Sequence, residues 1–100
     1  MANAQYTFTS ELWKWEARAS RYFVSLPEAV SDEIEAMYGA LAGGFGSLRV
    51  KVTVGGSRWS TSIFPDGKRA TYVLPVKKPV RIAEGLADGD PVHIDLVIAS

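Results

Sequence analysis

The sequence predicts a mainly β protein, a small (partly open or double-split) β-barrel of about six largely antiparallel strands with one or two short helices. Short segments rich in β-branched and aromatic residues recur along the chain, and glycine, proline or aspartate bounds them. Residues 47–54 alternate apolar and polar side chains without a break. By length, residues 1–100 form one domain, with a core expected over about residues 6–98.

The first half of the chain is expected to form two strands and a helix. Residues 6–16 form a strand whose apolar parity changes between Leu12 and Trp13, which is typical of a bulge or of a strand that passes from one sheet to another. Residues 20–26 form the next strand. Residues 27–41 carry apolar side chains at helical spacing with acids between them, which indicates a helix.

The second half is expected to contain four strands. Residues 47–54 and 57–64 form a hairpin around Gly55-Gly56, because glycine adopts the positive φ of a two-residue turn without steric cost. A fifth strand covers residues 69–74.

A short helix or turn over residues 75–85 ends at Gly85. An Asp-Gly-Asp turn then leads into the last strand, residues 91–98.

The formal net charge is +0, but the charges are segregated. Residues 49–81 hold eight basic side chains and one acid, whereas residues 22–48 and 82–100 each hold four acids and no Lys or Arg. A neutral total therefore leaves room for an anion-binding face, although it argues against a strongly basic nucleic-acid carrier.

The composition also restricts location and chemistry. The chain has no cysteine, which excludes a disulfide framework and a thiolate metal site. The opening "MANAQYTFTS" lacks the basic start and apolar run of a signal peptide, and no apolar run is long enough to span a membrane. We therefore expect a cytoplasmic protein.

The hairpin gives the sharpest candidate site. A two-residue turn sets Lys51 opposite Ser60 and Arg49 opposite Ser62. Arginine and lysine beside hydroxyl groups suit phosphate or carboxylate, so this face is a candidate for anion or nucleic-acid binding. A solvated face that discourages edge-to-edge association explains the same residues and is the preferred interpretation. The outward face holds Arg49, Lys51, Thr53, Arg58, Ser60 and Ser62.

A second basic cluster follows the fifth strand. Lys77, Lys78 and Arg81 extend the positive face of the hairpin if the barrel closes in a way that brings them together. We prefer the interpretation that they are surface charges offset by neighbouring acids.

Four aromatic residues are candidates for a stacking groove, as in barrels that bind single strands. Aromatic residues in strands are more often part of the core, and we prefer that interpretation. The four are Trp13, Trp15, Tyr22 and Phe23.

The sequence identifies no catalytic residue, metal ligand or cofactor site. His93 is the only histidine, and it is expected to face outward without a nucleophile paired to it. The glycine-rich segment at residues 43–46 precedes a strand and lacks the Lys-Ser/Thr of a phosphate-binding loop.

Four stretches resemble a family of small bacterial domains of unknown function, whose members occur alone or fused to a bacteriocin-protection-type domain. The stretches are "FTSELWKWE", "RYFVSLPEAVSDEI", "GGFGSLRVKVTVGGSRWSTSIFP" and "YVLPVKKPVRIAEGLADGD". The resemblance covers nearly the whole chain and implies a small barrel close to the double-split type. It implies no activity.

The C-terminal stretch "LPVKKPVRIAEGLADGDPVHIDL" is also similar to the half-barrel of AbrB-like transition-state regulators, which bind DNA as interleaved dimers. There, a strand, a short helix, a Gly-Asp turn and a strand follow one another. Here the chain is about twice as long as such a half, so one chain has room for both halves without an obligate dimer.

Three function hypotheses follow. The leading one is an uncharacterised binding or interaction module with an unknown partner, which is not an enzyme, needs no cofactor and is monomeric rather than dimeric. The alternative is binding of a nucleic acid or phosphate anion through the basic strand face. A small hydrolase-like enzyme that uses Ser/Thr and a carboxylate ranks last.

Overall fold

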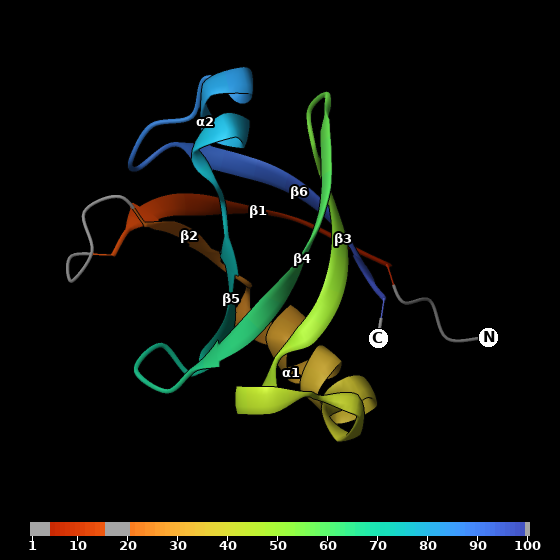
Figure 1. Ribbon diagram of the computed structural model, residues 1–100. Coiled ribbons are helices and arrows are strands. Elements are labelled where there is room, and N and C mark those ends of the chain that lie inside the picture. The colour runs from red at the N-terminus through yellow and green to blue at the C-terminus, as the bar shows by residue number, and fades with distance from the viewer. Residues whose placement is uncertain (1–4, 16–20, 100) are drawn as a thin grey trace.

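Six antiparallel strands close into a barrel in the order β1-β2-β5-β4-β3-β6 (Figure 1). The computed structural model describes residues 5–15 and 21–99. The predicted small antiparallel barrel with two short helices is confirmed, and the barrel is closed. In chain order the elements are β1 (Gln5–Lys14), β2 (Tyr22–Ser25), α1 (Glu28–Tyr38), η1 (Gly39–Leu41), η2 (Gly44–Gly46), β3 (Leu48–Val54), β4 (Ser57–Asp66), β5 (Thr71–Pro75), α2 (Lys78–Glu84) and β6 (Pro91–Ile98).

β1 changes its partner along its length. Residues 5–11 pair with β6, and residues 12–14 pair with β2. At the change, the backbone N–H of Leu12 donates to the carbonyl of Asp90 at 2.8 Å. The predicted passage of this strand from one sheet to another is therefore confirmed, while the predicted strand ends at residues 16 and 20 lie outside the described residues.

The β3–β4 hairpin has the predicted register. Val54 lies opposite Ser57, and Arg49 lies opposite Ser62. Gly55 has a φ of 56°, which its lack of a Cβ permits. Because side chains alternate across a strand, every second residue of both strands faces the barrel interior.

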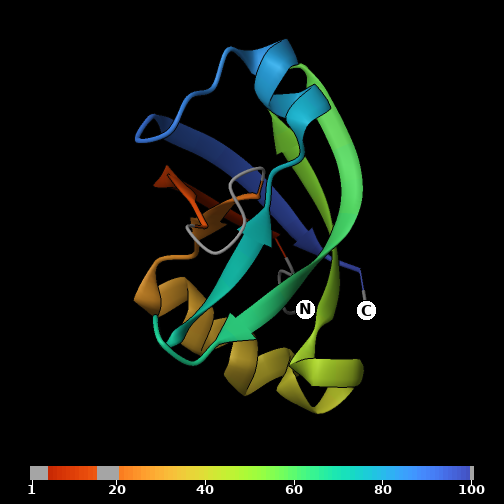
Figure 2. The same cartoon turned by 60° about the vertical axis from the view of Figure 1, so that its left-hand side comes forward.

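Side chains from all six strands fill the interior of the barrel and form the core. Its fully buried side chains are mostly Leu, Ile and Val at alternating strand positions, as the period of two requires. α1 covers one end of the barrel and α2 lies at the other (Figures 1 and 2). The largest fully buried side chains are Leu12, Leu26, Ile34, Leu48, Ile63, Leu74, Ile94, Leu96, Val24, Val50, Val52 and Val76.

The end of the barrel near α1 differs from the expected pattern. The predicted helix over residues 27–41 divides into α1 and the short η1. Of its apolar side chains, Ile34 is buried, whereas Met37 and Leu41 are exposed. Val30 and Tyr38 are partly buried against the core on either side of Ile34, so the barrel end covers most of the helix but not its whole apolar stripe.

β4 and β5 pair at one end only. They pair only where residues 64–66 meet residues 71–73, whereas β4 pairs with β3 from Ser57 to Ile63. The two strands therefore part toward the end of the barrel that carries α2. There the Ser57 hydroxyl donates to Glu84 Oε2 at 2.6 Å and ties the hairpin tip to α2.

β5, α2 and β6 follow one another in the order that the AbrB-like resemblance implies. β5 pairs with β2 and β4, and β6 pairs with β1 and β3. In the described part of the chain, neither helix has the length and apolar character needed to cross a bilayer.

Candidate anion-binding cleft

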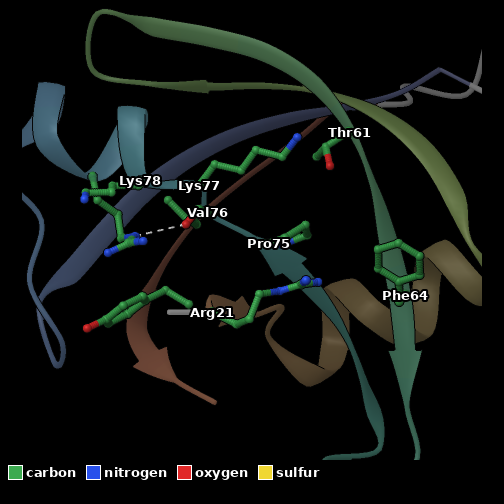
Figure 3. A pocket seen from close by; sticks show the side chains of 9 residues that line it. Arg21, Thr61, Phe64, Pro75, Val76, Lys77 and Lys78 are labelled. Atoms are coloured by element: carbon green, nitrogen blue, oxygen red, sulfur yellow. Dashed lines mark hydrogen bonds between the residues drawn. The ribbon is translucent and has the colours of Figure 1, made fainter. Parts of the chain in front are cut away.

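A cleft of about 410 Å³ opens where β4 parts from β5 (Figure 3). Its walls come from β4, from the segment that joins β5 to α2, and from the start of β2. Of the lining side chains in the described part of the chain, four are cationic and none is acidic. The lining residues are Arg21, Tyr22, Thr61, Phe64, Pro75, Val76, Lys77, Lys78 and Arg81.

The α2 side of the cleft is held by backbone and aromatic contacts. The N–H of Val76 donates to the carbonyl of Tyr22 at 2.9 Å, which continues the β2–β5 ladder past the end of β5. Arg81 Nε donates to the carbonyl of Val76 at 3.2 Å, and its guanidinium lies 3.9 Å from the Tyr22 ring centroid. These two contacts fix the guanidinium plane before any ligand arrives.

The opposite side of the cleft is formed by two residues of β4, the half-buried Thr61 and the exposed Phe64. In Figure 3 the side chain of Lys77 extends toward Thr61, while Arg21 extends past Pro75 toward Phe64. Thr61 faces the interior because it shares the parity of the buried Ile63, not that of Ser60 and Ser62.

This set of side chains suits an oxyanion. Guanidinium groups offer paired N–H donors, and lysine offers a mobile ammonium that follows a phosphate or carboxylate oxygen. A threonine hydroxyl adds a neutral donor. The rings of Tyr22 and Phe64 supply apolar surface beside these donors, so the cleft accommodates an anion that also carries an apolar or planar group.

The outer face of the β3–β4 hairpin is a different surface. Arg49, Lys51 and Arg58 are exposed there as predicted, and the Arg49 guanidinium donates to the Ser62 hydroxyl at 3.4 Å. Asp95 of β6 pairs opposite Thr53, so this face borders a carboxylate. Neither these residues nor Ser60 lines the cleft.

The structure divides the four predicted groove aromatics between two sites. Tyr22 lines the cleft, whereas Trp13, Trp15 and Phe23 line a second, larger concavity of about 1000 Å³. Tyr22 and Phe23 are adjacent in β2, so their side chains must leave the strand on opposite faces.

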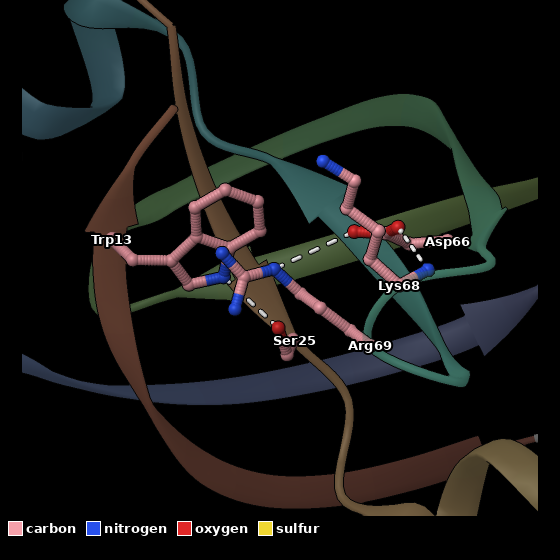
Figure 4. A network of polar contacts seen from close by, with 5 residues as sticks. All are labelled: Trp13, Ser25, Asp66, Lys68 and Arg69. Atoms are coloured by element: carbon pink, nitrogen blue, oxygen red, sulfur yellow. Dashed lines mark hydrogen bonds and ion pairs between the residues drawn. The ribbon is translucent and has the colours of Figure 1, made fainter. Parts of the chain in front are cut away.

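Trp13 is the centre of the second site (Figure 4). The Trp13 ring stacks on Phe23 with the ring centroids 5.2 Å apart, and Arg69 Cζ lies 3.6 Å from the centroid of the Trp13 ring. Trp13 Nε1 donates to the Ser25 hydroxyl at 2.9 Å. Arg69 is oriented by Asp66, whose Oδ2 lies 3.4 Å from Arg69 Nε.

Sequence reasoning missed Arg21, Thr61 and Phe64 in the cleft and Arg69 in the second site. The parity of Thr61 indicates an interior position in the hairpin, but nothing in the local sequence shows that β5 leaves this part of β4. The parity of Tyr22 and Phe23 was a usable signal that they belong to different sites.

Two tyrosines outside both concave sites have raised pKa values. Burial raises the pKa of Tyr6 to about 12, with a further contribution from Glu33. Burial and the charge of Glu35 also raise the pKa of Tyr72. Both tyrosines are in the core.

His93 is exposed, as predicted, and its Nδ1 lies 3.0 Å from the Thr9 hydroxyl. Among the described residues, no three His, Cys, Asp or Glu side chains are grouped in a way that would hold a metal ion.

Comparison with known proteins places the chain in a family without assigning it an activity. The model of a domain of unknown function, DUF1905, matches residues 8–96. No curated protein matches the chain. The sequence-based expectation of a small barrel domain from an uncharacterised family is confirmed.

Proposed function

We propose, for a chain that belongs to the DUF1905 family of domains of unknown function, that the cleft between β4 and β5 is a binding site for a phosphate-bearing ligand. One observation carries the proposal: among the residues that the structure describes, Arg21, Lys77, Lys78 and Arg81 line a single cleft together with no acidic side chain. Cationic side chains gathered in one concavity raise its positive potential, which attracts a multiply charged anion.

The size and the apolar surface of the cleft support the same proposal. Its volume of about 410 Å³ lies in the range of about 300–1000 Å³ that is typical of small-molecule sites. A phosphate group alone would leave the rings of Tyr22 and Phe64 unused. A ligand that joins phosphate to an apolar or planar group would contact both kinds of surface.

Isothermal titration with thymidine triphosphate and with inorganic triphosphate tests the proposal. A Lys77→Glu/Lys78→Glu variant should weaken binding by more than about tenfold, because each hydrogen bond to a charged group contributes about 1.5–3 kcal/mol. Both lysines are exposed, so the variant should fold, as circular dichroism would verify.

Lys51→Glu/Arg58→Glu is the matched control. It changes the net charge by the same amount but lies on the outer hairpin face. It should leave triphosphate affinity within about twofold at physiological salt, where distant charges are screened. Equal losses in both variants would contradict a cleft site. A loss in the control alone would favour the outer strand face.

A second candidate function is that of an interaction module, which binds a protein partner. That hypothesis predicts an open sheet edge, and β4 over residues 57–63 pairs with β3 alone. An extended peptide added to this edge would slow hydrogen exchange of the backbone amides of these residues. Triphosphate held by side chains would leave that exchange unchanged.

The non-enzymatic role, cytoplasmic location and monomeric state are part of the same proposal. Sedimentation of the purified chain tests the monomeric state. The hydrolase-like alternative predicts that thymidine triphosphate is consumed during the titration, and phosphate release measures that directly.

A further inference from the structure

We infer that the ligand is a single-stranded nucleic acid, with phosphates in the cleft and bases on an aromatic platform formed by Trp13, Trp15 and Phe23. The inference rests on the proposed function and names its ligand class. Two neighbouring sites of complementary chemistry carry it, one cationic and one aromatic.

Trp15 supplies the exposed ring of the platform, whereas Phe23 is buried beneath it. Trp15 meets Phe23 edge to face, with the ring centroids 6.1 Å apart, and 42% of Trp15 is exposed. Trp13 packs between Phe23 and Arg69 as a support. A large aromatic residue exposed beside an ordered ring stack is suited to accept a nucleobase, because every base offers a π-face.

The rim of the platform is mainly cationic. Among the described residues 5–15 and 21–99, Lys14, Lys68 and Arg69 line it together with one acid, Asp66. Asp66 is already engaged, because it pairs with Arg69 and its Oδ1 accepts the backbone N–H of Lys68 at 3.0 Å. Asp88, near the Lys14 end, accepts the backbone N–H of Lys14 at 3.1 Å. Positive rim charge around the exposed Trp15 ring complements a phosphate backbone rather than a neutral apolar partner.

Arg21 joins the platform to the cleft. It lines the cleft, and its Cζ lies 5.9 Å from the ring centroid of Phe23 in the platform. Phe64 and Pro65, which are adjacent in β4, line the cleft and the second site respectively. Free phosphate would use only the cleft, whereas a nucleic acid strand offers phosphates and exposed planar bases in repetition.

Fluorescence anisotropy with labelled oligothymidylate and oligouridylate of about ten nucleotides tests the inference, since barrels of the OB type that bind single strands cover about 4–16 nucleotides. The wild-type chain should bind them at least tenfold more tightly than thymidine triphosphate. Trp15→Ala should weaken oligonucleotide binding by about tenfold, the effect expected for losing one stacked base.

Two further variants separate stacking from folding. Trp15→Phe should restore most of the affinity, since it retains a ring, while removing the tryptophan quenching that the oligonucleotide causes. Phe45→Ala is the matched control, because Phe45 is 97% exposed and lines neither site. It should bind like the wild-type chain. Equal affinity of Trp15→Ala and wild type would overturn the inference.

Salt and charge variants test whether both sites act together. Four cleft cations give an expected slope of about −3 for the logarithm of affinity against the logarithm of salt concentration. Lys77→Glu/Lys78→Glu should reduce that slope. Triphosphate binding that depends on these lysines, without any gain for oligonucleotides, leaves the proposed function standing and refutes the nucleic-acid inference. Equally tight binding of a phosphoserine peptide would also refute it.

Discussion

Replacing Gly55 with alanine tests how the hairpin tip is fixed to α2. Gly55 has a φ of 56°, and an added Cβ would clash with the Glu84 carboxylate. That carboxylate accepts the hydrogen bond from the Ser57 hydroxyl. Glu84 ends in a flexible side chain, so it would swing aside, and the hydrogen bond would be lost instead of the backbone moving.

The expected cost is the sum of two terms. The left-handed conformation costs a residue with a Cβ about 1–2 kcal/mol, and loss of the hydrogen bond costs about 0.5–1.5 kcal/mol. Gly55→Ala should therefore lower the free energy of unfolding by about 1.5–3.5 kcal/mol. At an m-value near 1.5 kcal/mol/M, the urea midpoint would fall by about 1–2.3 M.

Gly56→Ala is the matched control, because nothing lies within 4 Å of its added Cβ and its backbone is outside the left-handed region. Urea unfolding followed by tryptophan fluorescence should show a change below about 1 kcal/mol for this variant. In a Glu84→Ala background, Gly55→Ala should cost only the backbone term. Equal costs for the two glycine variants, or the full cost in that background, would refute the reasoning.

Three other predictions concern the core. Because the pKa of Tyr6 is raised to about 12, the unfolded state loses the Tyr6 proton at a lower pH than the folded state does. The free energy of unfolding should therefore fall by up to about 3 kcal/mol between pH 10 and 12. Urea unfolding at several pH values should show that Tyr6→Phe reduces this fall. Ser31 Oγ accepts the buried N–H of Tyr72 at 2.9 Å, so Ser31→Ala should cost about 1–3 kcal/mol by the same measurement. Ile34→Ala should lower the free energy of unfolding by about 2–5 kcal/mol, whereas Met37→Ala on the exposed side of α1 should change it little, as calorimetry would verify.

Local rules predicted the strands and the hairpin well. The diglycine turn and the alternation of β3 fix the pairing of Arg49 with Ser62 before any long-range contact is known. The parity change after Leu12 marks the point where β1 moves from β6 to β2. Such features depend on neighbours in the chain, which is why the sequence contains them.

The candidate cleft depends on a different kind of information. Lys77 and Thr61 line one cleft only because β5 pairs with three residues of β4 and then continues beside β2 alone. Arg21 enters the cleft from another part of the barrel. The periodicity of one strand does not show how many of its residues pair with a neighbouring strand. The basic cluster at residues 77–81 was therefore predicted without the β2 and β4 residues that complete the cleft.

The pairing of β1 with β6 has a consequence for how the chain folds. Gln5 lies opposite Val97, so the first described strand is completed by the last. Closing this pair requires a loop of nearly the whole chain, whose entropy must be lost before the contact is gained. During synthesis, the edge of β1 that pairs with β6 therefore stays unpaired until β6 has been made. Closure of the barrel is a late step in folding.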